Sequence, residues 1–243
     1  DAAQLHGELT VSGPSQRAAL KGDLRATIVS PLLPQAELQL LATLAEGKLR
    51  ANLGTVTGNL KSEIQVGFEE PHIITITGSL NGLNFQELNP DFPCGTGSAL
   101  FSYQALLREP LRGSGDGELQ ALSIGCEQYV LWLTAPRRWF ISDGGITLPT
   151  TSLRGRGSEL SVEGSVTPQG MLIAAVKGAV DLSTFNGILA TVDDLRGQAV
   201  IDVSLRGALG SPAMTGDVTL MNAGIDIQSL ELSLDGVKAD ARF

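Results

Sequence analysis

The stretch AVIDVSLR, residues 199–206, decides the fold of this chain, because apolar and polar side chains alternate along it. The apolar positions are Ala199, Ile201, Val203 and Leu205, and the polar positions are Asp202, Ser204 and Arg206. Successive side chains of a β-strand point to opposite faces of the sheet. The alternation therefore predicts a strand with one apolar face and one polar face.

The same pattern occurs one hundred residues earlier. There the apolar positions are Ala99, Phe101, Tyr103 and Ala105, with Ser102 and Gln104 between them. Upstream, Ile74 and Ile76 fall opposite Ala174 and Val176, while Gly78, Phe85 and Gly97 recur as Gly178, Phe185 and Gly197. The matched parity predicts a repeated strand and turn unit whose copies present the same apolar face and stack into a continuous sheet. Such a sheet offers an extended surface instead of one pocket.

The composition favours an all-β chain with little helix. Among 243 residues there are 29 glycines, and only 5% are aromatic and 18% charged. Glycine and proline separate runs in which Val, Ile, Leu, Thr and Ser follow a period of two, as turns between strands require. The clearest runs are 63–68, 73–77, 159–162, 171–177, 217–221 and 229–234. The best candidate for a short helix is 182–189, with Asp181 or Ser183 as its cap.

The chain organisation points to one continuous segment over 1–243, with two related units at about 55–120 and 150–220. No linker separates them, and the Gly-rich and charged cluster 109–118 is expected to be a long turn. The sequence starts at Asp1, without a signal peptide and without the run of about 20 apolar residues that a bilayer-spanning helix needs. We interpret it as an excised or mature segment.

Charge and motifs exclude several function classes. A net charge of −9 opposes binding to nucleic acid, which requires clustered Lys and Arg. The chain has no nucleophile elbow, phosphate loop or zinc-protease motif, so we expect neither an enzyme nor a cofactor. The only cysteines, Cys94 and Cys126, form either one disulfide or two small buried thiols. No metal site is expected, because two cysteines cannot supply four zinc ligands.

The apolar face must be covered by something. In a closed sandwich or barrel a second sheet covers it, and in an open groove acyl chains could do so. The scarcity of aromatic residues and the even spread of aliphatic ones favour the groove. The expected lining residues are Ile64, Val66, Ile74, Ile76, Phe101, Leu160, Val162, Val176, Ile201, Val203, Leu205, Val218 and Leu220.

The last fifty residues carry a recognisable pattern. Leu-x-Gly at 205–207 is followed by Gly-Ser-Pro at 210–212, by Gly-x-Val-x-Leu at 216–220 and then by a paired strand. This pattern resembles the repeat of the AsmA-like superfamily, which includes TamB-like and YdbH-like branches. Residues 37–53 and 158–185 show a similar pattern.

The resemblance implies a particular fold, location and activity. It implies a twisted β-sheet curled into an elongated groove with an apolar concave face, as one segment of a longer periplasmic protein that is anchored in the inner membrane of a diderm bacterium. Phospholipids would pass along the groove toward the outer membrane. The implied partners are phospholipid, an outer-membrane lipoprotein or barrel, and the membranes that the ends of the full-length protein contact. The resemblance implies no catalytic residues.

Two other functions compete with lipid transport. A scaffold for outer-membrane protein assembly would accept a client strand on an open sheet edge. A structural or adhesive β-solenoid would have a filled interior and a regular period of about 20 residues. The sequence shows no such short period.

Overall fold

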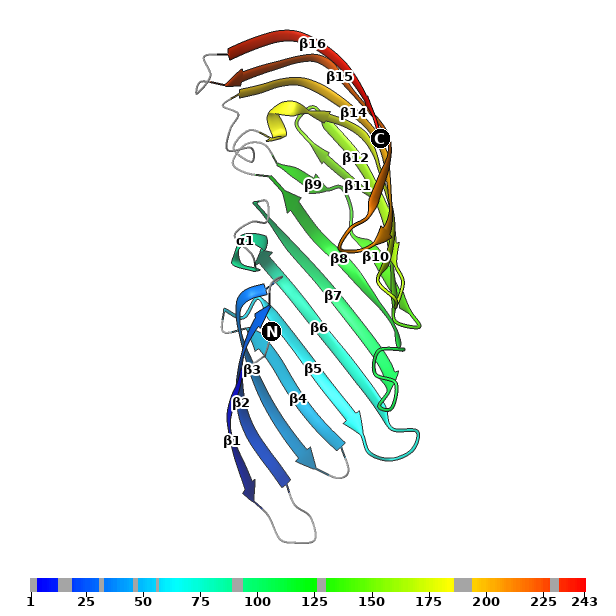
Figure 1. The fold of residues 1–243 in the computed structure, drawn as a ribbon. Helices are drawn as coiled ribbons and strands as arrows, with labels where there is room; N and C mark the ends of the chain where they lie inside the picture. Colours follow the sequence, from blue (N-terminus) through cyan, green and yellow to red (C-terminus); the bar gives the residue numbers. More distant parts are fainter. Residues whose placement is uncertain are drawn as a thin grey trace. The chain divides into compact units, whose positions relative to one another are not determined.

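The computed structural model describes residues 4–12, 19–30, 33–45, 48–55, 57–88, 94–125, 130–185, 194–227 and 232–243. Most of these residues form β-strands, and two short helical turns lie among them (Figure 1). The all-β class predicted from the alternation is therefore confirmed.

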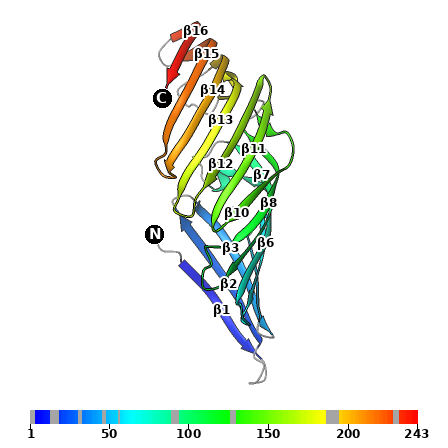
Figure 2. The same cartoon turned by 90° about the vertical axis from the view of Figure 1, so that its right-hand side faces the viewer.

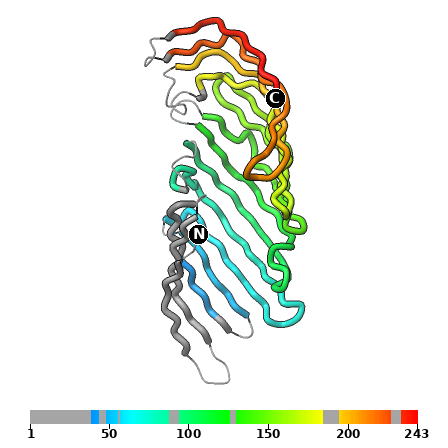
Figure 3. The backbone as a smooth tube through the Cα atoms, viewed as in Figure 1, coloured from blue at the N-terminus to red at the C-terminus, as the bar shows by residue number. Residues whose placement is uncertain are grey.

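The chain forms two compact units. Unit 1 consists of Asp1–Phe92, Thr96–Gln120 and Phe140–Gly144. Its strands are β1 (Gln4–Ser12), β2 (Ala19–Ser30), β3 (Leu33–Ala45), β4 (Lys48–Thr55), β5 (Leu60–Gly67), β6 (Ile73–Asn84), most of β7 (Gly95–Leu106) and parts of β8 (Ser114–Ile124) and β10 (Arg137–Ser142). From β1 to β7 each strand pairs antiparallel with the next one in the chain. The strands β4 to β7 run side by side (Figures 1 and 3).

Unit 2 consists of Pro93–Gly95, Ala121–Trp139 and Gly145–Phe243. Its strands are β9 (Leu131–Leu133), β11 (Gly145–Gly155), β12 (Ser158–Val166), β13 (Met171–Asp181), β14 (Asp194–Ala208), β15 (Ala213–Ile227) and β16 (Leu232–Arg242), with the remaining parts of β8 and β10. The strands β11 to β16 pair antiparallel in chain order and lie side by side (Figure 2). The short strand β9 pairs with β11 and with the end of β8.

Each unit contains one copy of the repeated strand–turn–strand element. In unit 1 the helical turn α1 (Phe85–Leu88) follows β6 and precedes β7, and in unit 2 the 3₁₀ turn η1 (Leu182–Phe185) follows β13 and precedes β14. When one hundred is added to the residue numbers of β6 and β7, their ranges overlap those of β13 and β14, as the repeated pattern in the sequence predicts. The compact units have wider bounds than the related units expected at 55–120 and 150–220.

The two helical turns are each capped by the polar residue that ends the preceding strand. Asp181 Oδ1 accepts hydrogen bonds from the Ser183 N–H at 3.0 Å and the Ser183 hydroxyl at 2.6 Å. The helix expected at 182–189 thus begins as predicted, although it is a 3₁₀ turn, and residues 186–189 lie outside the described ones. Alternation does not predict α1, in which Asn84 Oδ1 accepts the Gln86 N–H at 3.0 Å.

The expected turn at 109–118 is wrong in its second half, because β8 begins at Ser114. The turn that precedes β8 is closed by Tyr103, whose hydroxyl donates to the Pro110 carbonyl and accepts the Gly113 N–H, both at 2.8 Å. This closure lets the glycines that follow join the sheet. Of the strand expected at 229–234, only the residues from Leu232 onward lie in β16, and 228–231 lie outside the described residues.

Candidate functional site

Strands β4 to β7 of unit 1 share a continuous apolar face. Residues paired directly across antiparallel strands point to the same side of the sheet, so the register assigns each side chain to a face. One row across the four strands consists of Ala51, Ile64, Ile76 and Tyr103. The rows on either side of it are Leu49, Val66, Ile74, Ala105 and Leu53, Ser62, Gly78, Phe101. All five lining residues expected in this part of the chain therefore lie on one face.

The opposite face of the same strands is polar. Its central row consists of Asn52, Glu63, Thr77 and Ser102. Glu63 Oε1 accepts a hydrogen bond from Gln65 Nε2 at 2.8 Å, and the Ser102 hydroxyl donates to Asp116 Oδ1 at 3.0 Å. The sheet of unit 1 therefore has two chemically distinct sides.

On the apolar face of unit 1, the ring of Phe101 fills the space beside Gly78, which has no side chain. Gly78 pairs with Phe101, and a Cβ built on Gly78 would collide with the Phe101 ring and lie 2.7 Å from the Lys61 carbonyl oxygen. The aromatic ring therefore covers the backbone of the neighbouring strand, which keeps the face apolar where no side chain stands.

Unit 2 repeats this arrangement on β12 to β15. Its central row consists of Val162, Val176, Val203 and Gly216. The rows on either side are Leu160, Gly178, Ile201, Val218 and Gly164, Ala174, Leu205, Met214, and a further pair joins Ala199 to Leu220. All eight lining residues expected in this part of the chain share this face.

Glycine is required where β15 crosses this row. Gly216 has a φ of 132°, a conformation that side chains disfavour. A Cβ there would collide with the Asp202 carbonyl oxygen and lie 2.8 Å from the Val203 Cα. The close approach of β15 to β14 at this position therefore depends on the absence of a side chain.

The opposite face of unit 2 carries charges in register. Lys177, Asp202, Asp217 and Arg242 form one row across β13 to β16. Lys177 Nζ lies 3.1 Å from Asp202 Oδ1, and Arg242 Nε lies 2.7 Å from Asp217 Oδ1. The hydrogen bond and the charge of Asp217 raise the pKa of the Arg242 guanidinium. Each of the two facing carboxylates thus has its own cation, which offsets their mutual repulsion.

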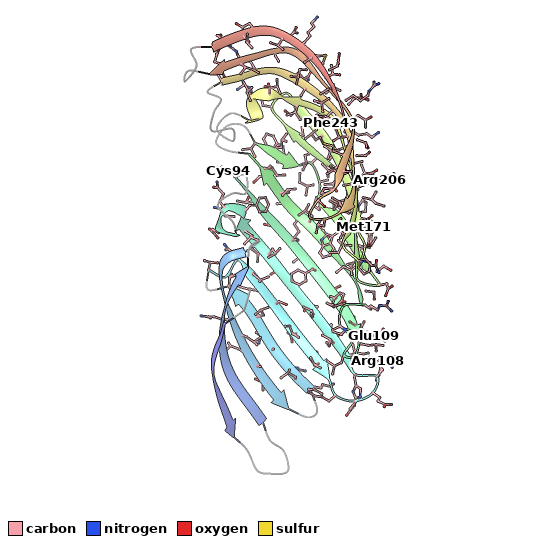
Figure 4. All side chains as sticks on the ribbon, in the orientation of Figure 1. Cys94, Arg108, Glu109, Met171, Arg206 and Phe243 are labelled. Carbon is pink, nitrogen blue, oxygen red and sulfur yellow. The ribbon has the colours of Figure 1, made fainter. Side chains whose placement is uncertain are left out.

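The apolar faces are only partly buried by the chain. Of the thirteen expected lining residues, Val66 and Val203 are buried at 8% exposure, and the other eleven are half-buried. The side chains that cover the ribbon are drawn in Figure 4. An apolar surface that remains accessible over several strands is a candidate binding surface.

The chain itself covers one end of the apolar face in unit 2. Leu182 of η1 packs with Leu195, Ala199 and Ala223, all 8% exposed or less, and partly buried Ile201, Leu220, Ile225 and Val237 surround them. Alternation did not identify Leu182, Leu195 or Ala223 as part of this surface. In unit 1 the Phe85 ring of α1 lies against Gly97, where a Cβ would be 3.2 Å from it.

The cysteines and the candidate metal-binding groups are found as follows. Cys94 is disulfide-bonded, and Cys126, the only other cysteine of the sequence, lies outside the described residues. Among the described residues no group of three or more His, Cys, Asp or Glu side chains is arranged to hold a metal ion. In the same part of the chain, no helix has the length and apolar character needed to cross a membrane.

Comparison with protein-family models, curated proteins and solved structures finds no match to this chain.

Proposed function

We propose that the apolar faces of this chain bind the acyl chains of phospholipids, and that the chain is one segment of a bridge-like lipid transporter of the AsmA-like type. The observation that carries the proposal is the in-register apolar face of each unit, half-exposed and backed by a polar face. In this proposal the faces line an elongated groove along which lipid moves toward the outer membrane.

The energetics of such a surface favour binding without a fixed position. Burial of an acyl chain contributes about 0.8 kcal/mol per CH₂ group. The buried hydroxyls on the face of unit 2 already have backbone partners, since Thr151 donates to the Pro149 carbonyl at 2.8 Å and Ser158 accepts the Asp181 N–H at 2.8 Å. They therefore offer little to anchor a lipid, and a bound chain is free to slide.

The disulfide at Cys94 supports an oxidising compartment, such as the periplasm that the sequence resemblance implies. Contacts with an outer-membrane lipoprotein or barrel, and with the two membranes, belong to the full-length protein in this proposal.

The test is native mass spectrometry with lipid extraction on the chain purified from a bacterial periplasm. Two matched pairs compare positions on opposite faces of the same strand: Leu205→Asp with Val200→Asp, and Ile76→Asp with Thr77→Asp. Leu205 and Ile76 are half-buried, so a carboxylate there should repel acyl chains at a smaller folding cost than at buried Val203.

We expect phospholipid to co-purify with the wild type and with the Val200 and Thr77 variants, and to be lost from the Leu205 and Ile76 variants while circular dichroism remains that of a β-sheet. A folded, lipid-free wild type would overturn the proposal and favour a scaffold that accepts a client strand. Unfolding of both Leu205→Asp and Ile76→Asp would instead indicate a closed, self-filled fold.

A further inference from the structure

Burial along the apolar face of unit 2 falls from one strand end to the other. At the end nearest η1, Val180 and Ala223 are 0% exposed and Ala199 is 3% exposed. At the opposite end, on the same face, Ile146 is 47% and Met214 is 41% exposed. The chain thus covers the face at the η1 end and leaves it accessible at the other.

Exposed apolar side chains gather at the accessible end. Met171 directly follows the β12–β13 connection as the first residue of β13, and Leu209 lies in the β14–β15 connection; they are 46% and 58% exposed. These two connections are joined, because the Leu209 N–H donates to the Gly170 carbonyl at 2.9 Å. We call Ile146, Met171, Leu209 and Met214 the apolar rim. Methionine adapts its shape to irregular apolar partners, which suits a surface that receives flexible chains.

A hollow of about 650 Å³ lies on the polar face close to this rim. The register places Thr147, Ser165, Ile173 and Arg206 in one row across β11 to β14, within two residues of the strand ends at the rim. Figure 4 labels Met171 and Arg206 in this part of unit 2. The hollow's polar lining is Thr147, Thr150, Glu163, Ser165, Lys177, Ser204 and Arg206.

The hollow contains one guanidinium that no ion pair formed by the described residues neutralises. Glu163 is the one carboxylate that lines it, and it accepts a hydrogen bond from the Thr150 hydroxyl. Lys177 is paired with Asp202, whereas Arg206 takes part in none of the ion pairs formed by the described residues. A guanidinium with hydroxyls nearby presents several donors in the geometry that phosphate oxygens accept.

We infer that unit 2 takes up phospholipid across the apolar rim, with the acyl chains on the apolar face and the phosphate of the headgroup in the hollow beside Arg206. This inference rests on the proposed function and adds a direction of uptake and a headgroup site. Uptake from the η1 end is opposed because Leu182 and its partners occupy the face there.

The test compares two fluorescent lipids that carry the same acyl chains: phosphatidylglycerol, which has a phosphate, and diacylglycerol, which has none. We expect Arg206→Gln to weaken binding of phosphatidylglycerol about tenfold, the effect of about 1.4 kcal/mol, and to leave diacylglycerol unchanged. Arg156→Gln is the matched control. Arg156 is also exposed and in none of the ion pairs of the described residues, but it lies in the β11–β12 turn at the η1 end.

The outcomes separate the two proposals. If neither lipid binds the wild type, the proposed function fails. If both bind, and Arg206→Gln weakens both equally or neither, only the headgroup site fails. Inorganic phosphate that binds at Arg206 as tightly as phosphatidylglycerol would reveal a site for free anions and overturn the lipid assignment.

A second readout tests the direction of uptake. Photo-cross-linking side chains at Met214 and at Ser183 sample the rim and the η1 end. Lipid adducts are expected at Met214 and not at Ser183. Adducts at Ser183 alone would show that lipid enters at the η1 end and would contradict the proposed direction of uptake.

Discussion

Leu182→Ala should destabilise unit 2 by about 2.5–3 kcal/mol. Leu182 is 8% exposed and packs with Leu195, Ala199 and Ala223. The change removes about three CH₂ equivalents at about 0.8 kcal/mol each, or about 2.4 kcal/mol. A cavity term adds to this cost, but η1 is a short turn at the end of a strand and can settle into part of the space, so the sum stays near the lower end of the range for buried leucines.

Urea unfolding followed by tryptophan fluorescence measures this loss. Trp132 and Trp139 are the only tryptophans and both belong to unit 2, so the signal reports on the unit that is changed. With a slope of about 1–3 kcal/mol per molar urea, the midpoint should fall by about 1–3 M.

Leu209→Ala is the control, because Leu209 is 58% exposed in the β14–β15 connection and should lose less than about 0.5 kcal/mol. If the two variants have the same midpoint, η1 does not hold the apolar face closed, and the argument for a covered end is refuted.

Three further changes test the remaining contacts. Gly78→Ala should cost about 1–3 kcal/mol because the new Cβ meets the Phe101 ring, whereas Gly210→Ala, with no atom within 4 Å of the new Cβ, should leave the melting temperature nearly unchanged. Cys94→Ala should cost about 2–4 kcal/mol, and a reductant should lower the melting temperature of the wild type but not of this variant; an equal effect on both would argue against a stabilising disulfide. Arg196→Gln should cost about 1 kcal/mol because Asp194, Asp226 and Asp235 lose their shared cation, and added salt should restore part of the loss by screening the carboxylates; stability that salt does not change would contradict this reason.

The faces of the sheet could be predicted from the sequence because alternation is a local property. A residue such as Val203 and its neighbour Ser204 must point to opposite sides in any extended strand, and equal parity at Phe101 and Ile201 carries that assignment from one unit to the other. No knowledge of distant partners is needed for this step.

The covered end of unit 2 could not be predicted in the same way. Whether Leu182 packs on Ala223 depends on where a turn returns relative to a strand forty residues later, which periodicity does not encode. The cap at Asp181 marks where η1 begins, but it does not tell in which direction the chain continues after the turn. The glycine-rich start of β8 was misassigned for a related reason, because Tyr103 closes the turn before it from another strand.

The two-sided register also restricts how a gene for this chain can change in length. Loss of one codon inside β14 would turn Asp202 and Ser204 toward the apolar side and Val203 toward water for the rest of the strand, whereas loss of two codons would keep every face. Connections such as 167–170 and 209–212 carry no such constraint. Homologous genes should therefore differ freely in their connections and by even numbers of codons within strands, so that parity is inherited more strictly than any single residue.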